Sequence, residues 1–354
     1  MRFLIIGQGL AGTLIGYRLE KAGHEVDYVD APGQTAASTV AAGIINPITG
    51  RRFVKSWRID ELIPVAKDLY QELEGLLRER FWYDLPLIRT LYHRGDMNDW
   101  QVRSADPGYA RYLDDTPELG QLPGLTVPVF AYAGVRHAAR VAVQRLVAAL
   151  RTKLQREGRL SEEIFDYQRV PQFLGAAAGA NKRGKEQAGY DHIICCEGWR
   201  ARDNPYFSYL PHGGNKGEVL IVKTEAPLLA RMFKHRVFLV PLANHTYWIG
   251  ATSENQFSDD QPTASNRTYL EDRLKEVLKV PYTLVGHRAA VRPTVRDRRP
   301  FLGQHPDIPG LWIFNGLGTK GASLAPLNSQ WLVEAILRGV TLPVEVDIRR
   351  FEGG

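Results

Sequence analysis

The chain opens with a short apolar run over residues 3–6, Phe-Leu-Ile-Ile, and a group of glycines follows at once. Apolar residues then recur at helical spacing from Leu14 to Leu19, which predicts an amphipathic helix. Gly23 ends that pattern, and residues 25–29 alternate between polar and apolar up to Asp30. Residues 2–30 therefore predict a strand, a tight turn, a helix and a second strand.

The turn between the first strand and the helix contains three glycines at a fixed spacing. It reads Gly7, Gln8, Gly9, Leu10, Ala11, Gly12. Gly7 allows the tight turn, Gly9 lets the backbone approach a pyrophosphate, and Gly12 lets the helix close on the strand. The free N–H groups of the helix N-terminus then face the phosphates. The pattern predicts a dinucleotide site.

Asp30 ends the second predicted strand, where a carboxylate accepts hydrogen bonds from a ribose diol. A carboxylate there would repel a 2′-phosphate, so NADP is disfavoured. This unit by itself does not distinguish an NAD site from an FAD site.

A run of small residues over 37–47 follows, with Ser38, Ala42 and Gly43 among them. Small side chains would let the backbone lie flat against a broad ligand such as a flavin. The alternative interpretation is a plain surface loop.

A second strand–turn–helix pattern lies near the C-terminus. Residues 311–314 predict a strand, Ala325-Pro326 is expected to open a helix that reaches Gly339, and the turn between them carries Gly316, Gly318, Thr319, Lys320 and Gly321. A helix N-terminus there would direct partial positive charge at one edge of a flavin ring and favour its reduction. An NAD enzyme has no need of this second turn, so the pattern favours FAD. We expect the flavin to be non-covalent, because no cysteine follows Cys196.

The composition narrows the classes of protein further. Among 354 residues, 44% are hydrophobic and 24% are charged, which excludes a disordered, collagen-like or disulfide-scaffold chain. No apolar run is long enough for a membrane span, and the N-terminus does not resemble a signal peptide, so we expect a cytoplasmic protein. The adjacent Cys195 and Cys196 are expected to be buried and reduced, and no zinc-like spacing predicts a metal site.

The chain resembles the FAD-dependent oxidases of the D-amino-acid oxidase/glycine oxidase type over nearly its whole length. The resemblance implies an α/β fold, in which a Rossmann-type FAD-binding domain is interleaved with a mixed-sheet substrate domain. Residues 1–50, 140–215 and 285–340 would form the first, 51–139 and 216–284 the second, and 341–354 a C-terminal tail. It also implies that Val170 closes a strand and contacts adenine, and that Gly198 turns beneath the cofactor.

The implied reaction is oxidation of the C–N bond of an amino acid or N-substituted glycine, with hydride transfer to flavin N5 and oxygen or another acceptor taking the electrons. Arg292, in Val291-Arg292-Pro293, aligns with the family's carboxylate-binding arginine, and a guanidinium fork suits a carboxylate. The alternative is an arginine that pairs with Asp297 and holds the turn.

Two further candidates for the substrate pocket have structural alternatives. Strand alternation puts Tyr247 and Ile249 on one face and Trp248 on the other, so either face lines the pocket or both serve packing. Lys320 either contacts the substrate or reacting oxygen, or caps the turn.

The Thr319-Lys320 turn and the 37–47 loop are also similar to the FAD domain of the bifunctional protein that modifies wobble uridine in bacterial tRNA. The net charge of +6 and the basic residues Arg51, Arg52, Lys55 and Arg58 fit that alternative. The basic residues are scattered, however, and we expect no tRNA binding. A third class of function is a flavin-binding protein without turnover.

Glu197 is unusual for the family, and its charge beside a flavin would need a partner such as an arginine.

Overall fold

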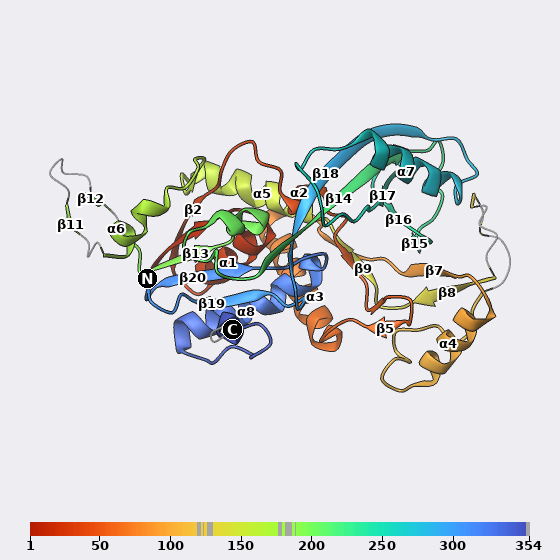
Figure 1. The fold of residues 1–354 in the computed structure, drawn as a ribbon, viewed down its shortest axis with the longest axis horizontal. Helices are drawn as coiled ribbons and strands as arrows, with labels where there is room; N and C mark the ends of the chain where they lie inside the picture. Colours follow the sequence, from red (N-terminus) through yellow and green to blue (C-terminus); the bar gives the residue numbers. More distant parts are fainter. Residues whose placement is uncertain are drawn as a thin grey trace.

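The computed structural model describes residues 1–118, 122, 124–125, 130–175, 179–180, 186–187 and 189–351. Within these residues, six strands form a sheet on the left of Figure 1, in the order β10–β2–β1–β13–β20–β19. These strands are, in the same order, Leu160–Ser161, Glu25–Val29, Arg2–Ile6, His192–Cys195, Leu311–Asn315 and Phe301–Gln304. All neighbours are parallel except β19 and β20.

The predicted N-terminal unit is confirmed. β1 leads through the glycine turn into α1 (Leu10–Lys21), and β2 follows after Gly23, whose φ is +85°. Phe3 and Ile5 are buried on one side of β1, and Leu4 on the other, because β1 lies in the middle of the sheet and both faces are covered.

α8 (Gly321–Arg338) packs beside α1 on one face of this sheet. It begins four residues before the predicted Ala325-Pro326 start, so Pro326 lies inside the helix. Proline has no N–H to donate to the carbonyl of Ala322 one turn earlier. The hydroxyl of Tyr70 donates to that carbonyl instead, at 2.9 Å, which compensates for the missing helix bond.

Seven strands form a second sheet on the right of Figure 1, in the order β18–β14–β17–β16–β15–β7–β8. They are Thr283–Val295, His212–Lys223, Thr246–Gly250, Phe238–Pro241, Met232–Lys234, Leu87–Leu91 and Ala131–Val135. One face buries Leu220, Tyr247 and Ile249 with Leu270 of α7 (Ala264–Lys275). The opposite face points toward the first sheet.

The longest strands run through two predicted domain boundaries. β14 contains the predicted boundary at 215, β18 contains that at 285, and the two strands pair with each other from His212–Val295 to Lys223–Thr283. Residues 285–295 therefore belong to the second sheet, although the sequence interpretation grouped them with the FAD-binding part.

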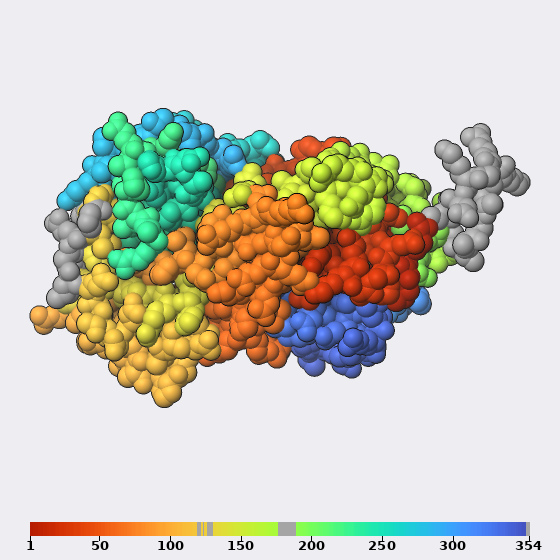
Figure 2. All heavy atoms as spheres, turned by 180° about the vertical axis from the view of Figure 1, so that it is seen from behind, coloured from red at the N-terminus to blue at the C-terminus, as the bar shows by residue number. Residues whose placement is uncertain are grey.

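The remaining elements connect and cover the sheets. The helices are α2 (Ala37–Val40), α3 (Ile59–Leu77), α4 (Arg94–Ala105), α5 (Val143–Arg156) and α6 (Val170–Gly175), with 3-10 turns η1 (Tyr167–Arg169), η2 (Gly198–Asp203) and η3 (Ile348–Phe351). The short strands are β3 (Ile44–Ile45), β4 (Ile48–Thr49), β5 (Val54–Lys55), β6 (Trp82–Asp84), β9 (Ala139–Val141), β11 (Gly179–Ala180) and β12 (Glu186–Gln187). Figure 2 shows the orange segment of α3 on the back surface, beside the red N-terminal segment. The stretch from 175 to 189, whose Gly, Ala, Lys and Asn residues predict a surface turn, lies mostly outside the described residues.

The predicted C-terminal tail packs against the first sheet as far as it is described. The Leu302 N–H donates to Val346, Ile348 is buried, and Arg350 forms an ion pair with Asp297 at 2.8 Å. Residues 341–351 thus form part of the first layer rather than a free extension.

Candidate active site

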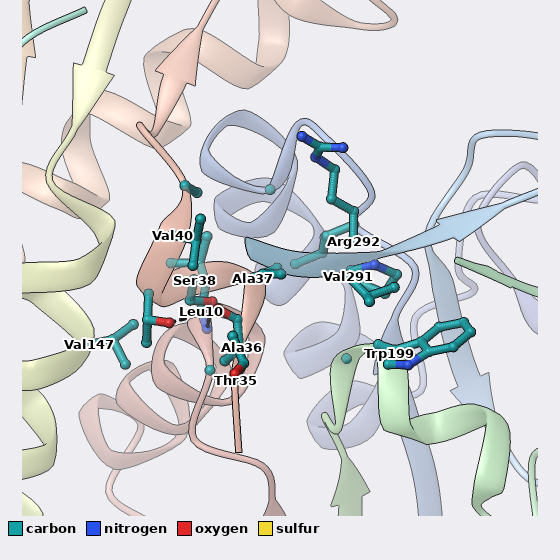
Figure 3. Close-up of a pocket in the computed structure, with 18 of the residues that line it drawn as sticks. Leu10, Thr35, Ala36, Ala37, Ser38, Val40, Val147, Trp199, Val291 and Arg292 are labelled. Carbon is teal, nitrogen blue, oxygen red and sulfur yellow. Dashed lines mark hydrogen bonds between the residues drawn. The ribbon is translucent and has the colours of Figure 1, made fainter. Parts of the chain in front are cut away.

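A cavity of about 1020 Å³ lies between the two sheets. Its floor at one end is formed by the carboxyl ends of β1, β2 and β13, and its far wall by β14, β17 and β18. Figure 3 shows Leu10 and Ser38 from the N-terminal segment on one side, and Val291 and Arg292 on the other. Ligands of open α/β sheets bind at this edge, outside the carboxyl ends of the strands.

The three glycines of the first turn have distinct roles. A Cβ on Gly7 would lie 2.6 Å from the Cys196 carbonyl oxygen, and one on Gly12 would lie 2.0 Å from the Gly7 carbonyl oxygen. Both residues therefore serve backbone packing. A Cβ on Gly9 would meet only the Ser38 hydroxyl, at 3.4 Å, and would otherwise project into the cavity.

Asp30 lies on the cavity wall, as the sequence predicts. The Gln8 N–H donates to its Oδ1 at 3.0 Å, and Arg151 of α5 forms an ion pair with its Oδ2 at 2.6 Å. Arg151 also lines the cavity, and sequence reasoning missed it because no local pattern links α5 to the end of β2. These contacts hold the carboxylate in place at the end of β2.

The small-residue loop covers the N-terminus of α1. The Leu10 N–H donates to the Ser38 hydroxyl at 3.0 Å, and Ala42 and Gly43 line the cavity beside it. A Cβ on Gly43 would lie 1.9 Å from the Val141 carbonyl oxygen, so the loop can lie flat only with glycine there. The interpretation of this segment as a plain surface loop is wrong.

The second glycine turn closes the cavity at the N-terminus of α8. Gly318, Thr319 and Gly321 line it, whereas Gly316 (φ +74°) does not and serves the turn, since a Cβ there would lie 2.6 Å from Val295. The free N–H groups of this long helix face the cavity with partial positive charge.

Lys320, predicted either to contact the substrate or reacting oxygen or to cap the turn, is the N-cap residue of α8. Its side chain is outside the cavity wall and donates to the Ser56 hydroxyl at 3.2 Å, while its carbonyl accepts from the N–H groups of Ser323 and Leu324. Lys320 therefore caps α8, which was the alternative interpretation. Burial, together with nearby Arg299 and Arg298, lowers the pKa of its ammonium group.

Arg292 lies on the cavity wall without an acidic partner among the described residues. Its guanidinium donates to the Asn215 side-chain oxygen and, at 3.3 Å, to the Thr252 carbonyl. Asp297 pairs with Arg350 instead, so the alternative that Arg292 holds the turn through Asp297 is wrong. Burial lowers the pKa of Arg292, yet a guanidinium stays cationic in proteins. A buried cation without a counterion is prepared for an anionic ligand.

The prediction that Tyr247 faces the pocket is also contradicted. Tyr247 is buried on the α7 side of the second sheet, and its hydroxyl accepts from the Leu228 N–H at 2.8 Å. Trp248 is on the other face, lines the cavity and donates to the Val40 carbonyl at 2.8 Å. Alternation separated the two faces correctly, but the packing of α7 decides which face meets the cavity.

We expect the Tyr247→Phe variant to lose about 1 kcal/mol of stability, because the Leu228 N–H loses its acceptor, and to keep its rate of flavin reduction within about twofold. The Trp248→Phe variant is the counterpart, since it lacks the indole bond to the small-residue loop and should show the slower reduction. Urea unfolding and stopped-flow absorbance measure the two effects. Slower reduction in Tyr247→Phe alone would return Tyr247 to the site.

Val170 does not contact the cavity. Residues 163–170 form no strand; Val170 begins α6 and is buried against the first sheet. Ile164 and Phe165, a few residues earlier, line the cavity in its place. The prediction that Val170 closes a strand beside adenine is therefore wrong.

Glu197 lies on the cavity wall, and no arginine in the described part of the chain pairs with it. Tyr167 and Asn204 donate to its Oε1, and its buried Oε2 has no partner among the described residues. Burial raises the pKa of this carboxyl, and the two hydrogen bonds only partly oppose that effect. Burial therefore shifts this carboxyl toward its neutral form relative to an exposed glutamate.

The raised pKa of Glu197 gives a pH test of stability. Between the ordinary carboxyl pKa and the raised value, the folded protein binds more protons than the unfolded chain, so the free energy of unfolding falls as pH rises. The slope reaches at most about 1.4 kcal/mol per pH unit. Urea unfolding between about pH 5 and about pH 7 should show a flatter profile for Glu197→Gln and an unaltered one for Glu225→Gln, at an exposed site. Parallel profiles for wild type and Glu197→Gln would contradict this assignment.

The cavity contains most of the residues that the sequence singled out. Those on its wall are Gly7, Gly9, Leu10, Ala11, Asp30, Ser38, Ala42, Gly43, Gly198, Arg292, Gly318, Thr319 and Gly321. The structure adds Arg151, Trp199, Lys234 and Phe238, which come from segments without a recognisable motif, and places Trp248 rather than Tyr247 on the wall.

The residues fit an extended dinucleotide. The cavity runs from the ribose-type carboxylate at Asp30, past the open space at Gly9 and the N-terminus of α1, to the second helix N-terminus at Gly321. The family described as FAD dependent oxidoreductase matches residues 2–335. The chain belongs to this family.

Individual relatives agree with the assignment of this FAD-dependent oxidoreductase. It is 26% identical over 349 residues to the glycine oxidase of Pseudomonas aeruginosa, covering 94% of both chains. The crystal structure of glycine oxidase from Geobacillus kaustophilus has a TM-score of 0.79, 22% identity and 97% coverage of both chains. That of iminodiacetate oxidase from Chelativorans sp. has a TM-score of 0.75, 19% identity, and 97% and 98% coverage.

The second predicted resemblance is also found. The enzyme is 25% identical over 385 residues to a tRNA 5-methylaminomethyl-2-thiouridine biosynthesis bifunctional protein of Acidovorax sp., covering 99% of this chain and 59% of that protein. Of the four basic residues, however, Lys55 pairs with Asp60 at 2.5 Å and Arg58 with Glu61 at 3.0 Å. Only Arg51 and Arg52 remain exposed, which is little for a phosphate-binding surface.

The described residues contain neither a membrane-spanning helix nor a metal-binding cluster. None of their helices is both long and apolar enough to cross a membrane. No group of three or more His, Cys, Asp or Glu side chains in the described part of the chain could hold a metal ion. Cys195 and Cys196 are buried and unpaired, as predicted.

Proposed function

We propose that this FAD-dependent oxidoreductase oxidises the C–N bond of a small amino acid or N-substituted glycine. One observation carries the proposal: Arg292 presents a half-buried guanidinium, without an acidic partner among the described residues, to a cavity that suits FAD. A carboxylate would supply the missing negative charge and occupy both arms of the fork. Relatives named glycine oxidase and iminodiacetate oxidase support this substrate class.

The protein's part in the reaction is to bind and orient. When bound, FAD supplies the acceptor for the hydride that leaves the substrate carbon. Arg292 holds the carboxylate and so determines which C–H bond can face the reacting centre. Trp248 and Phe238 line the same wall and exclude water from it. No side chain is assigned as a base, because the amine can lose its proton to solvent before it reacts.

Anaerobic mixing of the FAD-loaded enzyme with glycine, N-methylglycine and iminodiacetate tests the proposal. We expect the oxidised-flavin absorbance to bleach with at least one of these amines and not with methylamine, which lacks a carboxylate. Equal bleaching by methylamine would contradict the role of Arg292, and no bleaching by any amino acid or N-substituted glycine would contradict the proposed function.

The proposal concerns a free small molecule, with oxygen or another acceptor regenerating the oxidised flavin. The unpaired, buried Cys195 and Cys196 support the further proposal that the enzyme works in a reducing compartment, the cytoplasm. A titration with carboxymethylaminomethyl-modified tRNA at two salt concentrations checks the alternative, and we expect neither salt-dependent binding nor bleaching.

A further inference from the structure

The sheet face that points toward the cavity carries a second group of cations, which are half-buried. Residues directly opposite each other on paired strands share a face. Val219 faces Gly250, Gly250 faces Phe238, Phe238 faces Lys234, and Lys234 faces Arg89. Lys234 lines the cavity. Arg89 is its paired neighbour on the adjacent strand β7 and lies outside the cavity wall.

Neither cation has a carboxylate within ion-pair distance among the described residues. The Lys234 ammonium donates to the Arg236 carbonyl at 2.6 Å, and Arg89 donates to the Gly50 carbonyl at 3.2 Å. The buried Arg89 Nε has no hydrogen-bond partner in the described part of the chain. Burial and the neighbouring Arg89 lower the pKa of Lys234 to about 8, and burial lowers that of Arg89 to about 10. This pattern indicates unmet positive charge at the cavity wall.

The positions of the two charged groups on the wall can be read from their contacts. The Arg292 guanidinium lies over Gly217 of β14, where a Cβ would be 1.9 Å from its Nη2. The Lys234 ammonium lies 4.5 Å from the ring centre of Phe238 of β16. β17 separates β14 from β16, so the two strands beneath these charges are roughly 10 Å apart, two strand spacings. Gly217 also lies two residues before Val219 on β14, and Val219 is level with Phe238.

The strip of wall between the two charges is apolar. The Trp248 indole lies over Gly250, where a Cβ would be 2.9 Å from the ring, and Val219 and Phe238 flank it. A charge-assisted hydrogen bond at each end takes up about 2.8 Å, and the remaining span lies over this apolar strip. A ligand with two acidic groups on a bridge of a few atoms has these dimensions.

We propose that the substrate is a dicarboxylic amine, whose first carboxylate binds Arg292 and whose second, on the nitrogen substituent, binds Lys234 with Arg89 in support. The inference rests on the proposed function for the identity of the amine. The way the ligand binds does not depend on the oxidation reaction, because binding requires only two carboxylates and an apolar bridge between them.

Binding of an unreactive diacid tests the second anion subsite separately from the proposed oxidation. Oxydiacetate has the shape of iminodiacetate but no amine, and methoxyacetate is its single-acid counterpart. We expect calorimetry on the FAD-loaded enzyme to show oxydiacetate binding at least about tenfold tighter than methoxyacetate. Lys234→Met should remove that advantage and leave methoxyacetate within about twofold, whereas Lys223→Met, at an exposed site on β14, should change neither.

The flavin reduction assay completes the design. In Lys234→Met, we expect the reduction by iminodiacetate to need at least about tenfold more substrate, and the reduction by N-methylglycine to be unchanged. Equal affinity of the wild type for the two unreactive acids, or an equal loss for both in Lys234→Met, would overturn the inference. If no amine bleaches the flavin while oxydiacetate still binds through Lys234, the proposed function fails and the second anion subsite stands.

Discussion

Replacing Arg292 with Met is expected to lower the second-order rate constant of flavin reduction by about 100-fold or more, while FAD stays bound. Each charge-assisted hydrogen bond to a carboxylate contributes roughly 1.5–3 kcal/mol, and the fork forms two. Among the described residues the guanidinium has only neutral acceptors, Asn215 and the Thr252 carbonyl, so its loss leaves no described carboxylate without a partner. The fold should therefore survive the substitution. Anaerobic stopped-flow absorbance measures the rate.

Two further variants sharpen the Arg292 experiment. Arg292→Lys keeps the charge but loses the fork, so its rate should fall between those of the wild type and Arg292→Met. Arg288→Met removes a cation from the same face of β18, at an exposed position outside the cavity wall, and should leave the rate unchanged. Unchanged reduction in Arg292→Met, with the fold intact, would make Arg292 a structural residue.

Substituting Gly9 with Val is expected to weaken FAD binding by at least about 100-fold and leave the fold intact. The new side chain would meet only the Ser38 hydroxyl and otherwise fill the space beside the N-terminus of α1. Phosphate would then lose at least two charge-assisted hydrogen bonds from backbone N–H groups, worth roughly 3 kcal/mol or more. Ultrafiltration followed by flavin fluorescence gives the dissociation constant, and far-UV circular dichroism reports on the fold.

Gly12 and Gly75 provide the comparison. Gly12→Ala would place a Cβ 2.0 Å from the Gly7 carbonyl oxygen, so both the fold and FAD binding should suffer. Gly75 in α3 has no atom within 4 Å of an added Cβ, so Gly75→Val should change neither. Tight FAD binding by Gly9→Val would show that the phosphates do not lie at this turn.

The parts of the fold that the sequence predicts well are those determined by local chemistry. The two strands of the β1–α1–β2 unit were predicted to within a residue, and the helix between them was predicted in kind, because glycine spacing, helical periodicity and strand alternation all act over a few positions. The second turn at Gly318–Gly321 was predicted for the same reason, although Pro326 suggested too late a start for α8. A tyrosine from distant α3 compensates for that proline, and no local signal in α8 reports it.

The candidate site was predicted less completely, because its side chains are selected by packing between distant segments. Strand alternation places Tyr247 and Trp248 on opposite faces but does not say which face meets the cavity. That is decided by α7, which packs on the face of Tyr247. Lys320 has a glycine-rich setting typical of a site, but its side chain reaches Ser56 from the loop after β5. Lys234 carries no motif, and it joins the cavity only because β15 pairs with β16.

The chain order of the first sheet has a consequence for biosynthesis. β1 is made first, but one of its two neighbours, β13, lies at residues 192–195, and β20 beyond it lies at 311–315. The nascent N-terminal unit therefore has one strand partner nearby in sequence and must wait for the other through much of translation. Contacts this distant in sequence are slow to form and leave apolar strand edges exposed in the meantime. Chaperone capture of truncated nascent chains should accordingly persist until β13 has left the ribosome.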